Sequence, residues 1–297
     1  MSPDSRTAVS LVLGSGGARG LAHIGVIQWL ESNNYDIKSI SGCSMGALIG
    51  GIYACDELET FEEWVRAITK LDIVRLLDIS WGSEGLVEGE RIISVLKDLV
   101  GDRLIEDLPI KYTAVAANVK SEKEVWLTEG SLFDAIRASI SLPLFFTPFE
   151  LNGMQLLDGG ILNPVPIAPT FKDKTDLTIA VNLGGKPEDH QLPSAEIEPG
   201  ETLVPIEGDL SQKIANYIGE LKSRNSAANF GSWKMLDIAD KTFDAMQGAI
   251  ARQKLAAYPP DHTITLPRDA CGTLEFDRAD EMISIGFEAA ERMLTKL

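Results

Sequence analysis

The sequence predicts an α/β fold with a mostly parallel central sheet flanked by helices on both faces. An uninterrupted apolar run at residues 8–14 ends in glycines, as buried parallel strands usually do. Residues 21–30 then have helical spacing, and a strand at 37–40 leads into a second helix at 47–54. The order strand, helix, strand, helix is typical of right-handed βαβ units, which build parallel sheets covered on both sides.

The middle of the chain predicts further helices and a hairpin. Residues 57–100 have two helical stripes, separated by an apolar, irregular segment at 71–82. We interpret that segment either as a loop packed on the core or as a cap over the mouth of an active site. Strands are expected at 112–119 and 124–128, a helix at 131–140, and a hairpin at 149–157 turning at Asn152-Gly153, the pair favoured in type I′ turns.

The remaining elements are a buried strand at 177–183, a long helix at about 226–257, a strand at 262–266 and a final helix at 276–297. Residues 186–209 are rich in Pro, Glu and Asp, a composition that resists packing and predicts a mobile acidic surface loop. We expect one domain over residues 1–297. Its motifs lie within 8–185, and residues 210–297 form a helix-strand-helix ending.

Composition limits the partners and the compartment. The chain has 297 residues and a net charge of −17, from 27 basic and 44 acidic residues. No nucleic-acid partner is expected, because phosphate binding needs a basic surface. Three dispersed cysteines predict neither a disulfide framework nor a zinc site. A cytoplasmic protein is expected, with any membrane contact peripheral at the inner surface; the oligomeric state cannot be inferred.

Residues 42–46, Gly-Cys-Ser-Met-Gly, match the nucleophile elbow G-x-S-x-G. In such an elbow a sharp strand-to-helix turn exposes the serine hydroxyl, here that of Ser44. Gly42 and Gly46 are needed because the crossing strand and helix leave no space for a Cβ. A tight βα turn with an N-capping serine is the structural alternative.

A nucleophilic serine needs a base, and the sequence offers two kinds. The order Ser, acid, late His of α/β-hydrolases could be completed only by His262, since His23 and His190 lie elsewhere. The competing base is Asp158, at the end of a strand and followed by two glycines. A carboxylate can serve a serine directly if burial raises its pKa. Asp158 could also be a turn residue.

The glycine loop at residues 14–20 has two functional interpretations. A dinucleotide site of the G-x-G-x-x-G type would need a third glycine where Arg19 stands. The alternative is an oxyanion hole, in which the N–H groups of Gly16 and Gly17 face the acyl oxygen and Arg19 braces the loop.

Three ordered motifs together resemble the patatin-like phospholipases, in particular the bacterial branch similar to the catalytic domain of neuropathy target esterase. They are Gly-Ser-Gly-Gly-Ala-Arg-Gly at 14–20, Gly-Cys-Ser-Met-Gly at 42–46, and Ser-Leu-Pro at 141–143 followed by Asp-Gly-Gly-x-x-Asn-Pro-Val-Pro at 158–166. The resemblance covers about residues 8–185 and implies a patatin-like three-layer sandwich. One position departs from the family's usual glycine loop, because Ser15 stands where a glycine is common.

The resemblance implies a lipid acyl hydrolase with a Ser-Asp dyad and no histidine. Ser44 would be the nucleophile, Asp158 the base, and Gly16 and Gly17 the oxyanion donors. The substrate would be a lipid or another ester, and no cofactor or metal is expected. A non-catalytic regulatory or scaffold protein with this fold and an acyltransferase using the same dyad are the alternatives. Cys43 is a weaker candidate nucleophile, because the elbow projects residue 44.

Overall fold

A computed structural model of the protein describes residues 6–76, 89–143, 145–187 and 238–295. The chain divides into two compact units, one of residues 1–187 with 244–297 and one of residues 188–243. Of the second unit only 238–243 are described, and they are helical. The fold below is that of the first unit. The single-domain organisation expected for residues 1–297 stays a prediction, and the predicted acidic loop lies outside the described residues from 188 onward.

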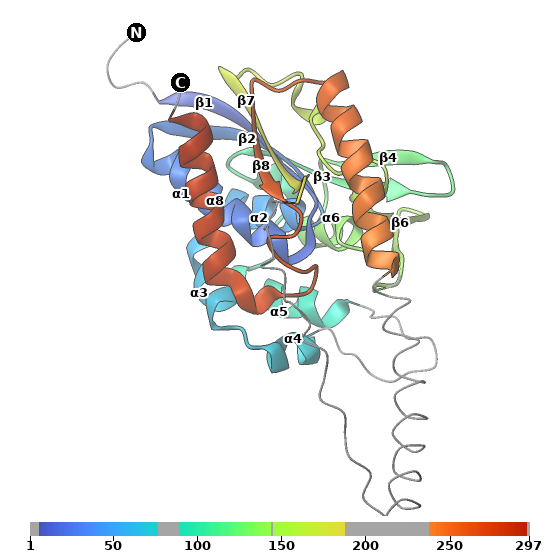
Figure 1. Ribbon diagram of the computed structural model, residues 1–297. Helices are drawn as coiled ribbons and strands as arrows, with labels where there is room; N and C mark the ends of the chain where they lie inside the picture. Colours follow the sequence, from blue (N-terminus) through green and yellow to red (C-terminus); the bar gives the residue numbers. More distant parts are fainter. Residues whose placement is uncertain (1–5, 77–88, 144, 188–237, 296–297) are drawn as a thin grey trace, which may run out of the picture. The chain divides into compact units, whose positions relative to one another are not determined.

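The first unit is built on an eight-stranded sheet whose order is β5-β6-β3-β2-β1-β7-β8, with β4 paired to β3 (Figure 1). The five strands β3, β2, β1, β7 and β8 are mutually parallel, and the antiparallel strands β4, β5 and β6 lie at the β3 side. Their bounds are β1 Thr7–Leu13, β2 Tyr35–Cys43, β3 Lys111–Asn118, β4 Lys123–Leu127, β5 Phe149–Leu151, β6 Met154–Asp158, β7 Leu177–Gly185 and β8 His262–Pro267. The predicted fold class is confirmed.

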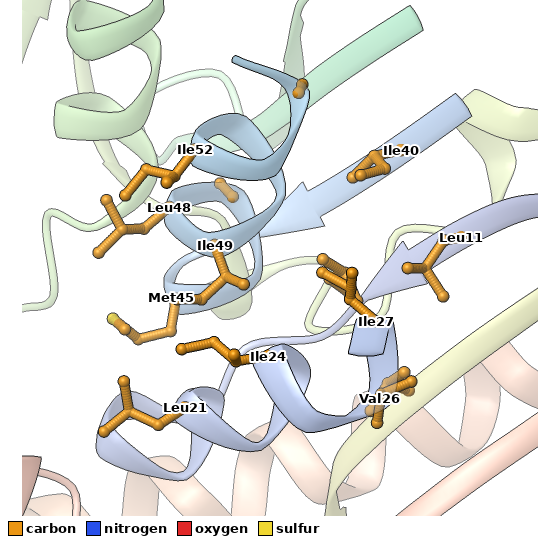
Figure 2. Close-up of a cluster of buried hydrophobic side chains, with 14 of the residues drawn as sticks. Leu11, Leu21, Ile24, Val26, Ile27, Ile40, Met45, Leu48, Ile49 and Ile52 are labelled. Atoms are coloured by element: carbon orange, nitrogen blue, oxygen red, sulfur yellow. The ribbon is translucent and has the colours of Figure 1, made fainter. Parts of the chain in front are cut away.

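Apolar side chains of β1 point to both faces of the sheet, so both faces are covered. Leu11 and Leu13 belong to the main core together with apolar side chains of helices α1 (Ala22–Ser32) and α2 (Met45–Ala54), several of which are drawn in Figure 2. Val12, between them, joins a second core with Ala251 of the helix over residues 244–257. Successive residues of a strand face opposite sides, which explains why the strand sequence is apolar throughout.

Helix α8 (Ala279–Leu294) packs on α1 with close backbone contact. A Cβ on Gly286 would lie 1.9 Å from the carbonyl oxygen of Ala22, and a Cβ on Gly25 would lie 1.9 Å from that of Ile283. Two glycines therefore allow the helices to approach more closely than any side chain would permit. The elements α1, α8 and the preceding glycine loop form one packed group.

Between α2 and β3 the described residues contain three α-helices, α3 (Leu58–Ala67), α4 (Lys70–Leu76) and α5 (Glu90–Val100). The irregular segment expected at 71–82 is helical over its first six residues, and its remainder, 77–82, lies outside the described residues. Short 3₁₀ turns were not predicted from the sequence; η1 (Gly17–Leu21) leads into α1. Helix α6 (Leu132–Ser139) follows the β4 strand.

The predicted hairpin is present, with β5 and β6 joined by Asn152 and Gly153, both at positive φ (51° and 73°). Of the long helix predicted at about 226–257, residues 238–257 are helical and the earlier ones are not described. On this helix the side chain of Met246 is 54% exposed. The next residue, Gln247, is buried, and it brings a polar side chain of this helix to the candidate site.

Candidate active site

Ser44 lies at the sharp turn between β2 and α2. Its φ of 55° and ψ of −123° fall outside the comfortable region for an L-residue, which is the strained geometry of a nucleophile elbow. A Cβ on Gly42 would lie 2.4 Å from the Gly46 carbonyl oxygen, and one on Gly46 would lie 2.1 Å from that of Leu13. Both glycines are therefore required for the strand and the helix to cross at this distance.

The Ser44 hydroxyl donates a hydrogen bond to Asp158, with 2.5 Å between Oγ and Oδ2. Asp158 is the last residue of β6 and its side chain is fully buried. Its other oxygen, Oδ1, accepts the N–H of Gly160 at 2.7 Å. A Cβ on Gly159 would lie 2.1 Å from the Val115 carbonyl oxygen, so the turn after Asp158 can lie this close to β3 only with glycine there.

Burial sets the protonation behaviour of this carboxyl group. Loss of water raises the pKa of Asp158 to about 6, although hydrogen bonds from Ser44 and Gly160 oppose the rise. The neighbouring Cys43 thiol is also buried, and burial, together with the charge of Asp158, raises its pKa well above the usual value. Cys43 therefore stays a neutral thiol, which disfavours it further as a nucleophile.

Within the part of the chain that the structure describes, the glycine loop has two backbone N–H groups without a hydrogen-bond acceptor. The N–H groups of Gly14, Ser15 and Ala18 are bonded to the carbonyl oxygens of Val181, Pro164 and Thr273, respectively. Among the described residues, no partner accepts a hydrogen bond from the N–H of Gly16 or Gly17. Gly17 has a φ of 56° and lines the same cavity as Ser44.

Arg19 contacts the glycine loop from within the protein. Its side chain is 4% exposed, and its Nε donates to the Gly16 carbonyl oxygen at 2.9 Å. The two other guanidinium nitrogens reach Asp244, at 2.7 and 3.2 Å, and the Arg268 carbonyl oxygen at 2.6 Å. A bidentate ion pair of this kind fixes both the position and the orientation of the guanidinium group. The bracing expected for Arg19 stays a prediction; its observed partners include two residues from the C-terminal part of the chain, Asp244 and Arg268.

Sequence reasoning missed two residues of the helix over 244–257. Besides Asp244, this helix supplies Gln247, whose Nε2 donates to the Ser15 hydroxyl at 3.2 Å. Ser15 is the position at which the glycine loop departs from its usual composition, so an unusual hydroxyl has a dedicated amide partner. In each of these two contacts the partners are more than 220 residues apart in the sequence. Nothing in the local pattern around 244–247 indicates them.

None of the described histidines contacts Ser44. His23 is fully buried; its Nε2 lies 2.8 Å from the Gly14 carbonyl oxygen, and burial lowers its pKa to about 4. His262 begins β8, three strands away from β2 in the sheet order. At the usual strand spacing that is about 14 Å. His190 lies outside the described residues. The Ser-acid-His order considered for His262 is therefore unsupported by this geometry.

An apolar cavity opens beside Ser44. Apart from Ser44 and Thr273, the residues that line it are apolar or glycine, and none is charged. They come chiefly from α2, α3, α4, α5 and the segment after α6, with Leu48, Phe61, Trp64, Leu96 and Phe146 among them. Ile73 and Leu76 bring the start of the proposed cap segment into this lining; the rest of that segment is not described. Such a lining suits a hydrocarbon chain.

No group of three or more His, Cys, Asp and Glu residues in the described part of the chain could hold a metal ion. Across the same residues, every helix is too short or too polar to traverse a bilayer.

Comparison with known proteins places the motifs in a family. The family model described as patatin-like phospholipase matches residues 11–171. An uncharacterized NTE family protein of Mycobacterium tuberculosis is 37% identical over 98% of this chain and 92% of its own length. A lysophospholipase NTE1 of Pyricularia oryzae is 27% identical over 98% of this chain, which spans 18% of that longer protein.

The fold has a counterpart among solved structures. VipD from Legionella pneumophila matches with a TM-score of 0.50 at 14% sequence identity, over 98% of this chain and 67% of that one. At this level of identity the likeness concerns the fold alone.

Proposed function

The chain belongs to the patatin-like phospholipase family, and we propose that it is a serine lipid acyl hydrolase acting through a Ser44-Asp158 dyad. The observation that carries the proposal is the 2.5 Å hydrogen bond from the Ser44 hydroxyl to a buried carboxylate, next to an apolar cavity that Ser44 lines. A nucleophile, a base in direct contact with it and space for an acyl chain are the parts that ester hydrolysis requires.

In the acylation step, Ser44 Oγ attacks the ester carbonyl carbon while its proton moves to Asp158 Oδ2. The tetrahedral intermediate then expels the alcohol, which takes the proton from Asp158, and an acyl-serine remains. A base with a pKa of about 6 is well matched to this exchange near neutral pH, because it is mostly ionised yet accepts a proton readily.

The glycine loop would stabilise the negative charge on the carbonyl oxygen. The N–H groups of Gly16 and Gly17 have no partner among the described residues and are the available donors. Each donor of an oxyanion hole typically contributes about 3–4 kcal/mol to the stabilisation of the transition state. The Arg19 contacts described above would keep these donors in place as charge develops.

Deacylation repeats the same chemistry with water. Asp158 accepts a proton from a water molecule that attacks the acyl-serine carbonyl carbon, and the Ser44 Oγ leaves with that proton, releasing the fatty acid. The apolar cavity would hold the acyl chain through both steps. An alcohol in the place of water would make the reaction an acyl transfer.

The proposal is tested with p-nitrophenyl esters and a fluorophosphonate probe. Ser44→Ala should abolish both turnover and covalent labelling while circular dichroism and thermal unfolding stay near the parent's. Ser15→Ala is the comparison, because it removes a nearby hydroxyl that lies outside the dyad and should keep labelling. Mass spectrometry of the labelled parent should find the probe on Ser44.

Two results would overturn the proposal. Full labelling and turnover by Ser44→Ala would place the nucleophile elsewhere, and an inert parent on every ester and lysophospholipid offered would favour the non-catalytic scaffold. Release of free fatty acid, compared with esters formed on added alcohols, separates hydrolysis from acyl transfer.

A further inference from the structure

The segment Ser139-Ile140-Ser141, at the C-terminal end of α6, contacts the backbone of both members of the dyad. Ile140 lines the apolar cavity, but neither serine takes part in the chemistry proposed above. We propose that this segment is the positioning frame of the dyad, in which the Ser139 hydroxyl holds the nucleophile elbow and the Ser141 carbonyl holds Asp158. The inference rests on the proposed function and adds two positioning residues to it.

Ser139 connects the elbow to the central sheet. The N–H of Ser44 donates to Ser139 Oγ at 2.9 Å, and the same hydroxyl donates to the carbonyl oxygen of Val115, in β3, at 2.6 Å. The Ser139 side chain is fully buried, so water does not compete for either bond. The Ser139 hydroxyl thus links the Ser44 backbone to the Val115 carbonyl of β3 and helps to set the distance between them.

Ser141 holds the backbone of the other member of the dyad, Asp158. The N–H of Asp158 donates to the Ser141 carbonyl oxygen at 2.9 Å, at the point where β6 ends. The Ser141 hydroxyl is itself held, since it accepts from Arg137 Nη1 at 2.7 Å and donates to the Arg137 carbonyl oxygen at 2.8 Å. Arg137 is buried, with its guanidinium group 5.5 Å from the centre of the Phe146 ring. The Ser141 side chain is therefore held by two hydrogen bonds to Arg137, next to the carbonyl that accepts from Asp158.

The two contacts matter because Ser44 and Asp158 are 114 residues apart and must meet within 2.5 Å. Ser44 also holds a positive φ that an isolated chain would relax. Strand β2 is paired with β3 only as far as Cys43, so without the Ser139 hydroxyl the buried Ser44 N–H loses its partner and the link from Ser44 to the Val115 carbonyl is lost. A displacement of the reacting atoms by about 1 Å can cost about a hundredfold in rate.

The same contact decides which donors can serve the oxyanion. Because the Ser44 N–H is already bonded to Ser139, it is unavailable to a substrate carbonyl in this arrangement. The oxyanion must then be stabilised by other N–H groups, such as those of Gly16 and Gly17. Ser139 therefore separates the two tasks, holding the nucleophile on one side and leaving charge stabilisation to the glycine loop.

The decisive variant is Ser139→Ala, with Ser41→Ala as its matched control. Ser41 is an equally buried serine on β2, and its Oγ has no hydrogen-bond partner among the described residues. We expect Ser139→Ala to lower kcat and the rate of fluorophosphonate labelling by about 10–100-fold, with KM within about threefold. Ser41→Ala should leave all three near the parent values, and Ser139→Thr, which keeps the hydroxyl, should recover much of kcat.

The pH profile supplies a readout that a purely structural role would not move. The Ser44 hydrogen bond lowers the pKa of Asp158, so a loosened contact should shift the acid limb of kcat/KM to higher pH in Ser139→Ala. If the Ala variant does not fold, Ser139→Cys, which has nearly the same volume but a weaker hydrogen-bonding group, is assayed in its place. Parent-like kcat, labelling and pH profile in the folded variant would overturn the frame.

The outcomes also separate the two proposals. If Ser44→Ala abolishes turnover but Ser139→Ala does not lower it, the dyad stands and the positioning role of Ser139 is wrong. If Ser44→Ala remains active, the dyad itself is wrong and the frame has nothing to position.

Discussion

The carboxyl group of Asp158 is fully buried and accepts a hydrogen bond from the Ser44 hydroxyl, which it would deprotonate. Burial raises its pKa to about 6, so the carboxylate form needed for base catalysis declines below that pH. We expect kcat/KM for a neutral ester to fall on the acid side with a single limb near pH 6, and to lack a limb that belongs to histidine. Initial rates between pH 4.5 and 8.5 measure it. A profile flat to pH 4.5 would contradict an Asp158 base.

The same shift predicts how Asp158→Asn affects stability. The folded-state pKa of about 6 lies above the ordinary 3.8, so ionisation of Asp158 opposes folding: the cost is absent below about pH 4 and complete above about pH 6. Asn removes the cost: its one carbonyl oxygen can accept from the Gly160 N–H, as Oδ1 of Asp158 does, and its NH2 group can donate to the Ser44 hydroxyl in the place of Oδ2. At pH 8 the free energy of unfolding should rise by about 2–3 kcal/mol, although activity is lost.

Urea unfolding of the parent and Asp158→Asn at pH 8 and pH 4.5 measures this difference. The gain should shrink at the lower pH, where the parent carboxyl group is protonated in the folded state. A variant that is less stable than the parent at both values would show that burial is not the dominant influence on Asp158.

At the level of elements, α4 places one face on the apolar cavity and the other in water. Ile73 and Leu76 line the cavity, whereas Leu71 on the same helix is 69% exposed. Changing Ile73 and Leu76 together to Ser should reduce kcat/KM for long-chain esters more than for short ones, because each buried methylene contributes about 0.8 kcal/mol. Kinetics on p-nitrophenyl esters of two to twelve acyl carbons measure the difference.

Leu71→Ser is the control for α4, because it adds the same hydroxyl to the face directed away from the cavity. It should leave the chain-length profile unchanged. Equal losses on short and long esters in the double variant would mean that α4 only completes the core, as in the loop interpretation of this segment.

On the scale of the whole molecule, the sheet order separates His262 from the elbow. Three strand spacings lie between β8 and β2, and His262 stands at the start of its strand, whereas Ser44 follows the end of β2. We therefore expect His262→Gln to keep kcat/KM within about tenfold of the parent, a change of at most about 1.4 kcal/mol in the activation free energy. Steady-state kinetics with a folding check by circular dichroism tests it. A loss of several orders of magnitude would restore a histidine base.

Some features of this protein are determined by stretches of a few residues and could be predicted from the sequence. The apolar run of β1, the Asn152-Gly153 turn and the glycine spacing around Ser44 each depend on interactions between near neighbours. Strand periodicity, positive φ and the absence of a Cβ are local properties, so the strand order along the chain and the elbow could be predicted. The family motifs then pointed to Asp158 as the partner of Ser44.

Other features were decided only by tertiary packing. The Ser44-Asp158 contact spans 114 residues, the Arg19-Asp244 pair 225 and the Ser15-Gln247 contact 232. The family motifs pointed to the first pair, but its distance could not be predicted. No local pattern indicates the other two pairs, because one Asp or Gln on a helix cannot be told from another in the sequence until the fold brings distant elements together. The pKa of Asp158 near 6 likewise depends on the exclusion of water by the whole fold, and so does the frame at 139–141. Residue types came from the sequence, whereas their distances and protonation come from burial, which only the folded chain creates.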